Sequence, residues 1–260
     1  MSLRAENYYR ATSLEDAYNK LSENPKNAIV AGGLWMKKTG LQYATLIDLA
    51  DLKLDRIYEE GEEIHVGAMV SLRDFETSPI INKLFSGATA FAVREVMGPA
   101  FRNSATIGGS VFGRYPFSDV IAGLLPLDVR VRLYPKQEMS LEELLSYKGK
   151  LNGFLEEIII KKEEGKGYFK KVKTTALDFS MLNVSIVKRG GKNYIAIGSR
   201  PGVAALAYKA MEEANKGNFE EAGKIAAEEL SYLDSSNISK EYRQDLVKVY
   251  VRRGLEEVNK

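Results

Sequence analysis

The sequence predicts an α+β fold, in which a two-part N-terminal domain is followed by a C-terminal domain of strands and helices. Two observations carry this prediction: consecutive strand patterns begin after about residue 141, and three helical patterns follow them. Runs of strands followed by runs of helices are typical of α+β proteins. A chain of 260 residues has room for one large or two small domains. We expect an N-terminal domain over residues 1–162, with subdomains of about 1–54 and 55–162, and a C-terminal domain over 163–260.

The first subdomain is predicted to be a small β-α-β-β unit. Thr12 and Glu15 have the spacing of a capping box, with Thr12 as the N-cap, at the start of a helix over residues 12–22. The segments "NAIVAGG" and "ATLIDLADL" have the composition of strands. The first of these strands runs directly into Gly32 and Gly33.

The second subdomain is predicted to be a larger α/β unit. It begins with a hairpin that turns near Gly61 and continues with a short helix over residues 71–77. Apolar residues at helical spacing indicate one helix over 80–96, and the alternation in "DVRVRLYP" predicts a strand. Between them, the run 105–107 resembles a short strand that leads into Gly108-Gly109.

The C-terminal domain is predicted to be a three-stranded antiparallel sheet followed by a helix bundle. The segment "SIVKRGGKNYIAIG" places Gly190-Gly191 between two apolar runs, which is a hairpin signal. Apolar residues at helical spacing then indicate three helices, over about 203–214, 218–230 and 239–257.

Composition excludes several classes of function. The 37 basic and 35 acidic residues leave a net charge of +2, without the basic patch that nucleic-acid binding usually needs. No apolar run approaches the roughly 20 residues that span a bilayer, and the N-terminus lacks the apolar region of a signal peptide. We therefore expect a cytoplasmic protein that binds neither nucleic acid nor membrane. The absence of cysteine removes disulfides, thiolate zinc sites and ordinary iron–sulfur ligation from this chain.

The chain offers no obvious acid–base or metal-binding set. Its one histidine, His65, lies in a strand pattern, where a surface or half-buried structural side chain is the usual outcome. With one histidine and no cysteine, Ser-His-Asp catalysis, Cys-His catalysis and a multi-histidine metal site are poorly supported. We expect no catalytic residue and no metal ligand.

Two glycine pairs, Gly32-Gly33 and Gly108-Gly109, each follow an apolar run. Glycine allows positive φ and lets backbone come close to a ligand, and successive N–H groups in such turns bind phosphates. Tight turns would explain the pairs equally well. The dinucleotide fingerprint G-x-G-x-x-G and the P-loop are both absent.

The residues around the second pair resemble a known family, the FAD-binding subunits of the molybdenum hydroxylases. This family includes the medium subunit of carbon monoxide dehydrogenase and the flavin domain of xanthine dehydrogenase, and it shows A-G-G near the N-terminus and R-N-x-[AG]-T-I-G-G-N-x-x-x-x-x-P-x-x-D later. The second motif is matched without a gap by Arg102, Asn103, Ala105, Thr106, Ile107, Gly108, Gly109, Pro116 and Asp119. The start "YYRATSLEDA" and the end "EYRQDLVKVYVRRGLEE" also resemble this family, so the resemblance spans the chain.

The resemblance implies a noncovalent FAD site between the N-terminal and C-terminal domains. Backbone and hydroxyl groups of two loops would hold the diphosphate: Ala31, Gly32, Gly33, Leu34 and Trp35 from the first, and Thr106, Ile107, Gly108, Gly109 and Ser110 from the second. The motif residues Arg102, Asn103 and Ser104 would also bind the cofactor. Asp119 would help bind the polar part of FAD, and Ile159 would pack on its ring. Lys170 matches a lysine near that ring, where a cation favours the anionic reduced flavin; Asp178 matches an aspartate of the same segment.

The resemblance further implies a subunit that takes electrons from iron–sulfur clusters on a partner and passes them through FAD to NAD or another acceptor. The molybdopterin would lie on a third subunit. Leu34-Trp35 and Ser110 depart from the family's usual polar pair and asparagine. That departure keeps open an FAD-free scaffold or regulatory subunit of the same fold. A stand-alone FAD oxidoreductase is the third alternative.

Overall fold

The computed structural model describes residues 3–149, 151–236 and 238–260, and the chain packs as two compact units. The first unit comprises the described parts of Met1–Phe75, Pro99–Gly113 and Val129–Ile160. The second comprises the described parts of Glu76–Gly98, Arg114–Asp128 and Lys161–Lys260. Both units mix helices with sheets, as the sequence predicts, and the two-domain division at residue 162 stays a prediction.

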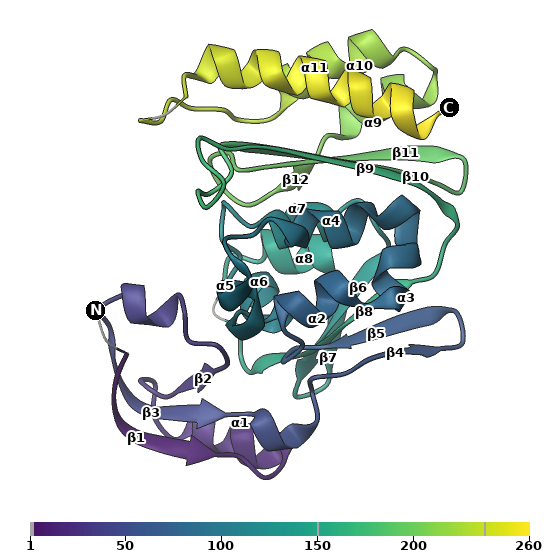
Figure 1. The fold of residues 1–260 in the computed structure, drawn as a ribbon. Coiled ribbons are helices and arrows are strands. Elements are labelled where there is room, and N and C mark those ends of the chain that lie inside the picture. The colour runs from purple at the N-terminus through teal and green to yellow at the C-terminus, as the bar shows by residue number, and fades with distance from the viewer. Residues whose placement is uncertain (1–2, 150, 237) are drawn as a thin grey trace. The chain divides into compact units, whose positions relative to one another are not determined.

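The N-terminal part of the first unit is a three-stranded parallel sheet with one long helix (Figure 1). The chain forms β1 (Arg4–Arg10), α1 (Leu14–Ser22), β2 (Ala28–Val30) and β3 (Gln42–Asp48), with short 3₁₀ turns at Met36–Lys38 and Ala50–Leu52. The strand order is β1-β3-β2, and Ala17 of α1 shares a core with Ile47 of β3. This confirms the predicted β-α-β-β unit.

The cap of α1 lies one residue later than predicted. Ser13, not Thr12, is the N-cap, and its hydroxyl accepts a hydrogen bond from the Asp16 N–H. The Asp16 carboxylate reaches back to the N–H of Thr12 at 2.8 Å. Asp16, not Glu15, is therefore the acidic partner of the cap. Its carboxylate accepts from the N–H of Thr12, the residue before the N-cap.

The larger sheet of the first unit has five strands in the order β4-β5-β8-β6-β7. On β6, apolar Val129, Val131 and Leu133 are buried, while Arg130 and Arg132 alternate with them on the other face. The predicted hairpin at Gly61 is confirmed. The elements are β4 (Ile57–Glu60), β5 (Glu63–Gly67), α2 (Leu72–Thr77), α5 (Pro99–Ser104), α6 (Ile107–Phe112), β6 (Val129–Tyr134), β7 (Gln137–Ser140), α8 (Leu141–Ser146) and β8 (Phe154–Lys161).

No strand runs into the second glycine pair, so that expectation is wrong. Ala105 and Thr106 connect α5 to α6, and only an isolated bridge joins Thr106 to Ser71. Gly108 and Gly109 lie in the first turn of α6. The Thr106 hydroxyl caps that helix, which turns a locally strand-like run into a helix start.

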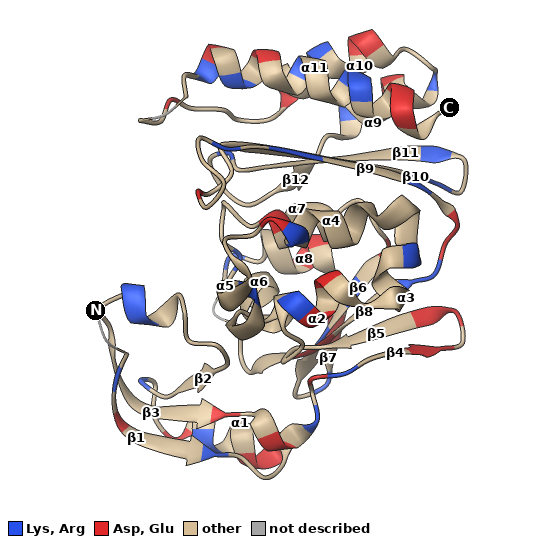
Figure 2. Cartoon of the chain, in the orientation of Figure 1, with Lys and Arg blue, Asp and Glu red and all other residues tan. Residues whose placement is uncertain are grey.

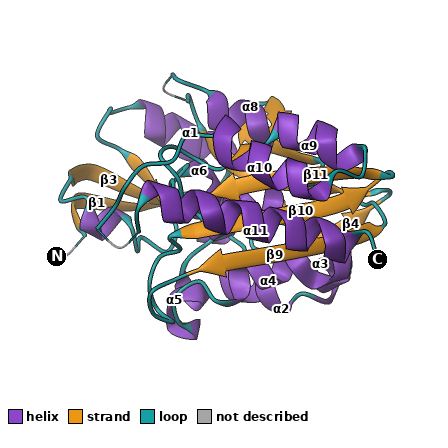
Figure 3. Cartoon of the chain, turned by 90° about the horizontal axis from the view of Figure 1, so that it is seen from above, coloured by secondary structure: helices purple, strands orange, loops and turns teal. Residues whose placement is uncertain are grey.

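The second unit is built on a sheet of order β12-β11-β10-β9 with helices on both faces. The hairpin at Gly190-Gly191 is confirmed, and a fourth, two-residue strand adds to the three predicted ones. Helices α9 to α11 cover one face (Figure 3), while α4 and α7 contact β9 and β11 on the sheet. The elements are β9 (Gly165–Val172), β10 (Leu182–Arg189), β11 (Lys192–Gly198), β12 (Ala205–Leu206), α7 (Asp119–Leu124), α9 (Tyr208–Asn215), α10 (Phe219–Glu229) and α11 (Lys240–Val258).

The single helix predicted over 80–96 is broken in the structure. It forms α3 (Pro79–Lys83), a 3₁₀ turn at Leu84–Gly87 and α4 (Ala88–Arg94). Phe85 and Ser86 adopt positive φ angles of 46° and 58°. The break brings the Phe85 backbone against β9, where a Cβ on Gly167 would lie 2.7 Å from the Phe85 carbonyl oxygen. Tertiary packing therefore overrides the helical spacing of the apolar residues.

Helix α10 crosses α11 at a point where only glycine fits, so Gly223→Ala should destabilise the second unit. A Cβ at Gly223 would lie 2.6 Å from the Lys248 carbonyl oxygen. We expect the substitution to lower the free energy of unfolding by about 1–3 kcal/mol, the usual effect of overpacking. Urea unfolding measures the change. Gly98→Ala is the control, since its Cβ would meet only Leu177, at 4.0 Å; equal losses in both variants would contradict the argument.

Candidate functional site

The two predicted diphosphate loops lie side by side in the first unit. A Cβ on Gly32 would lie 1.9 Å from the carbonyl oxygen of Ser104, at the end of α5. Any side chain at position 32 would therefore force the loops apart. Residues 31–35 are half-buried, whereas Asn103 and Ser104 are exposed. The structure thus brings together two segments that are 70 residues apart in the sequence.

The first loop offers unused backbone donors. Among the residues that the structure describes, none accepts a hydrogen bond from the N–H groups of Gly32, Gly33 or Leu34. Gly33 has a φ of +62°, in the left-handed region that only glycine adopts easily. Successive unpaired N–H groups beside a left-handed residue form an anion-binding turn. This loop can therefore receive a phosphate without breaking any existing hydrogen bond.

The second loop differs from its expectation, because its backbone donors already have acceptors within the chain. The N–H of Ile107 donates to Val70 at 2.9 Å, and that of Gly108 donates to Ala68 at 2.9 Å. The N–H of Gly109 donates to the Thr106 hydroxyl oxygen at 3.1 Å. Its side of the site can offer the hydroxyl groups of Thr106 and Ser110, although the Ser110 hydroxyl donates to the Thr106 carbonyl at 2.9 Å.

The two glycines of this pair have different roles. Gly108 is buried, and a Cβ there would lie 2.5 Å from the Ala68 carbonyl oxygen, so packing requires glycine. Gly109 is exposed, and its Cβ would meet only the Thr106 hydroxyl, at 3.1 Å. Only Gly109 therefore leaves a bare backbone surface that a ligand could touch.

Two other predicted residues are buried. Arg102 in α5 is 5% exposed and Ile159 in β8 is 1% exposed. Trp35, from the first loop, is half-buried, and Lys38 lies over its ring at 5.6 Å.

In the second unit, Asp119 is the centre of a buried polar cluster. Its carboxylate accepts hydrogen bonds from the Ser180 hydroxyl at 2.7 Å and the Asn183 amide at 2.8 Å, and from the Lys171 ammonium at 3.3 Å. The Asn183 amide also donates to the Ser199 hydroxyl oxygen at 3.2 Å. Asp119 begins α7, so its carboxylate ties that helix to β9 and β10.

Lys171 is the lysine beside Asp119, and the preceding Lys170, which the resemblance places near the flavin ring, points to the other face of the strand. Successive side chains of a strand point to opposite faces, and on β9 Lys170 lies over the Tyr250 ring of α11 at 5.5 Å. Lys171 is buried and also donates to the Ala92 carbonyl at 3.0 Å. Burial lowers its pKa, and the Asp119 carboxylate opposes that shift. The sequence signal that could have found this pair is the second lysine of "YFKKVK".

Aromatic residues on either side of the motif's Pro116 stack with Phe179. The rings of Tyr115 and Phe117 are 5.4 Å apart and nearly parallel, and Phe117 contacts Phe179 at 4.5 Å. Arg114 before them adopts a φ of +48°. Asp178 accepts a hydrogen bond from the Phe179 N–H at 2.9 Å. The stack lies on both sides of Pro116 in the sequence, directly before Asp119.

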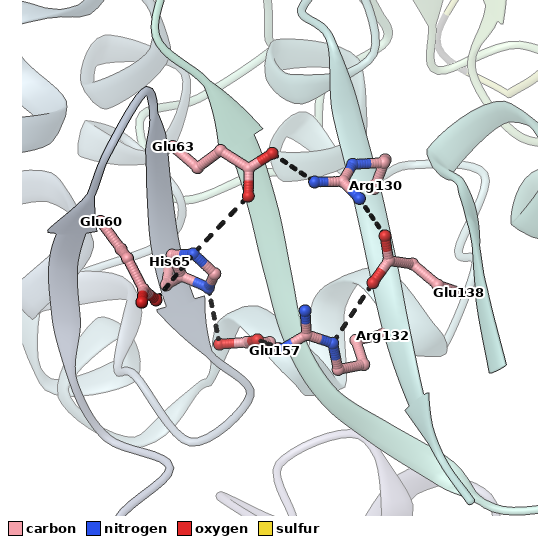
Figure 4. Close-up of polar contacts among 7 residues, drawn as sticks. All are labelled: Glu60, Glu63, His65, Arg130, Arg132, Glu138 and Glu157. Atoms are coloured by element: carbon pink, nitrogen blue, oxygen red, sulfur yellow. Dashed lines mark hydrogen bonds and ion pairs between the residues drawn. The ribbon is translucent and has the colours of Figure 1, made fainter. Parts of the chain in front are cut away.

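His65 is buried in the first unit rather than at its surface or half-buried (Figure 4). Its ring stacks on Tyr58 at 4.9 Å, and its Nδ1 lies 3.2 Å from the Glu157 carboxylate. Polar contacts close a ring across β5, β8, β6 and β7 on the charged face of the five-stranded sheet. The ring joins His65, Glu63, Arg130, Glu138, Arg132 and Glu157.

This ring is a structural network. Burial by itself would lower the pKa of Arg132, but the Glu157 and Glu138 carboxylates outweigh burial and raise it. Acidic and basic residues are both scattered over the elements of the two units (Figure 2). Over residues 3–149, 151–236 and 238–260, no three His, Cys, Asp or Glu side chains are grouped as metal ligands, and no helix is long and apolar enough to cross a membrane. The cytoplasmic location stays a prediction.

The family profile described as "FAD binding domain in molybdopterin dehydrogenase" matches residues 3–161. The chain belongs to this family. It is therefore an FAD-binding subunit of the molybdenum hydroxylase type of oxidoreductase, as the motif resemblance predicts.

Relatives of this FAD-binding chain align over nearly its whole length. The nicotine 6-hydroxylase medium subunit of Paenarthrobacter nicotinovorans is 27% identical, with 99% of this chain and 98% of the relative covered. The putative xanthine dehydrogenase FAD-binding subunit of Escherichia coli K12 is 23% identical, covering 96% and 94%. Among solved structures, carbon monoxide dehydrogenase from Hydrogenophaga pseudoflava superimposes with a TM-score of 0.90 at 22% identity, covering 99% and 98%. That likeness establishes the fold.

The residues of the first unit fit an FAD diphosphate. The N–H groups of Gly32, Gly33 and Leu34, from which no described residue accepts, supply donors, and Gly109 of the second loop has an exposed backbone. These groups are neutral dipoles that can hold an anion without burying an opposite charge. The departure at Leu34-Trp35 changes side chains and leaves the backbone donors in place.

The burial of Lys171 predicts a pH dependence of stability. Because burial holds the pKa of Lys171 below its ordinary value of 10.5, the unfolded chain binds more protons there than the folded chain. The contribution of Lys171 to stability should therefore rise with pH from its lowered pKa up to 10.5. Tm is measured against pH for the parent and Lys171→Met, which removes this rise. Identical profiles for the two proteins would contradict the argument, and exposed Lys166→Met is the control.

Proposed function

We propose that this FAD-binding subunit transfers electrons within a multi-subunit molybdenum hydroxylase. It would accept them from iron–sulfur clusters on one partner and deliver them to NAD or another acceptor, while the molybdopterin is held by a further partner. The observation that supports this most is the full-length alignment with medium and FAD-binding subunits. The absence of cysteine agrees with it, since clusters bound by thiolates must then lie on another chain.

In this proposal the chain binds and orients the cofactor, and bound FAD supplies the electron-exchange chemistry. The N–H groups of Gly32, Gly33 and Leu34 hold the diphosphate, and the exposed backbone of Gly109 lies against it. The other residues of the two loops, from Ala31 to Trp35 and from Arg102 to Ser110, shape the site around these contacts. Asp119 of the second unit, held by Lys171, would help bind the polar part of FAD, as the resemblance implies. Residues 1–162 would form the FAD-binding domain, and residues 163–260 the C-terminal domain.

The structure gives less support to Lys170 than to the two loops as part of the proposed FAD site. Its ammonium is exposed and lies over the Tyr250 ring, so it is already paired with an aromatic face. Ile159 is buried within β8, and the resemblance implies that it packs on the flavin ring. Both residues stay proposals of the family resemblance.

Gly109→Val should abolish FAD retention while leaving the chain folded. The added Cβ would meet only the Thr106 hydroxyl of the protein, at 3.1 Å, and position 109 is exposed, so the loss would come from the ligand side. We expect flavin absorption bands after incubation with FAD and desalting in the parent, and a loss of at least tenfold in FAD occupancy in the variant. The spectrum of the purified chain, with its Tm, measures both effects.

The control is Ser146→Val, at an exposed helical position of the same unit. Equal FAD retention by Gly109→Val and the parent would refute the contact at Gly109. A colourless parent, also when co-expressed with its partner chains, would favour the scaffold alternative. Co-purification with cluster-bearing and molybdenum-bearing chains separates the electron-transfer subunit from a stand-alone oxidoreductase.

A further inference from the structure

We propose that Arg200 binds an oxyanion, a phosphate or carboxylate group, at the end of β11 in the second unit. This inference goes beyond the proposed function and does not depend on FAD binding. It rests on the rigid placement of the loop 198–202 and on a guanidinium that the described residues leave without a counter-charge.

The loop is held in an unusual backbone conformation. Ser199 has a φ of +56°, a left-handed value that non-glycine residues rarely adopt. Its N–H donates to the Pro116 carbonyl at 3.2 Å, and its hydroxyl accepts from the fully buried Asn183 amide at 3.2 Å. These two bonds fix the backbone directly before Arg200. Such strain persists only where the surrounding structure enforces it.

The guanidinium of Arg200 is half-buried and poorly partnered. Its Nη1 donates to the carbonyl of Pro201 at 3.0 Å, and its Nε is buried without an acceptor. No carboxylate of a described residue lies within 4.0 Å of it. Arg189 in the same unit shows the usual alternative, since it pairs with Glu163 at 2.8 Å and with the Pro126 carbonyl at 3.1 Å.

Two acidic residues of the second unit already accept hydrogen bonds from backbone N–H groups. Glu229 accepts hydrogen bonds from the N–H groups of Lys209 and Ala210, and Asp234 accepts from that of Lys240. The Tyr232 hydroxyl donates to the Ala226 carbonyl, and burial raises its pKa. Burial correspondingly lowers the pKa of Arg200, as expected for a cation that lacks an opposing charge.

An oxyanion would supply the acceptors and the negative charge that the guanidinium of Arg200 lacks among the described residues. A guanidinium presents a planar fork of donors that matches two oxygens of a carboxylate or phosphate, and only one bond to the protein uses that fork here. Gly202 has a φ of +84°, and no atom lies within 4 Å of the position its Cβ would occupy. The loop therefore leaves open space two residues from the cation.

The test is a titration of the FAD-loaded full-length chain with inorganic phosphate, at constant ionic strength set with sodium chloride. FAD loading fills the diphosphate site, so that the titration reports on other anion sites. We expect a saturable rise in Tm for the parent protein. Arg200→Gln should weaken the apparent affinity by roughly tenfold or more, the usual effect of losing a charge-assisted pair. Arg252→Gln, at an exposed position of α11, should titrate like the parent.

The outcomes separate the possibilities. An unchanged curve in Arg200→Gln would overturn the proposal, as would a linear rise without saturation in the parent. If Arg200→Gln does not fold, Arg200→Lys keeps the charge but not the fork, and a parent-like affinity in that variant would also overturn it. A parallel titration with acetate shows whether Arg200 binds a carboxylate more tightly than a phosphate. A chain that retains no FAD would count against the proposed function alone, since the phosphate curve can still be recorded.

Discussion

The candidate site depends on backbone segments that meet with no room for a side chain. Gly32 touches the Ser104 carbonyl, and Gly108 touches Ala68. Both contacts lie in the first unit, and together they hold the loop after β2 and the helix α6 in one place. Every N–H that we assign to the diphosphate is positioned by these contacts, because a displaced loop would aim its donors elsewhere.

In the second unit, the buried carboxylate of Asp119 holds several segments together. Asp119 gathers Lys171, Ser180 and Asn183, and through Asn183 it reaches Ser199. Breaking a buried ion pair by removing one partner usually costs about 3–5 kcal/mol, since the other charge is left uncompensated. The motif aspartate is thus fully engaged by its own chain, and its effect on a cofactor would be exerted through the segments that it fixes. The strained backbone at Ser199, and with it the placement of Arg200, belongs to the same network.

The sequence predicted elements whose signal is local. Hairpins at Gly61 and Gly190-Gly191 need a particular turn chemistry, and the long helices α10 and α11 need a sustained apolar stripe; both signals are readable without tertiary contacts. The break at Phe85 was not readable, because the apolar spacing continues across it and only the approach of β9 reveals it. The buried position of His65 likewise depends on carboxylates from three strands.

Within the candidate site, too, the sequence alone does not show which of two neighbouring residues makes a contact. The resemblance assigns Lys170 of β9 to the flavin ring, but a shift of one residue in a strand turns a side chain to the opposite face. Of the two successive lysines, Lys171 pairs with Asp119 and Lys170 lies over the Tyr250 ring. The register of β9 decides which lysine faces which side. The glycine pair behaves in the same way: the sequence presents two equivalent glycines, and the helix start assigns Gly108 to packing and Gly109 to the open surface. A family motif therefore predicts where a cofactor binds, whereas the fold decides which residue of each pair can touch it.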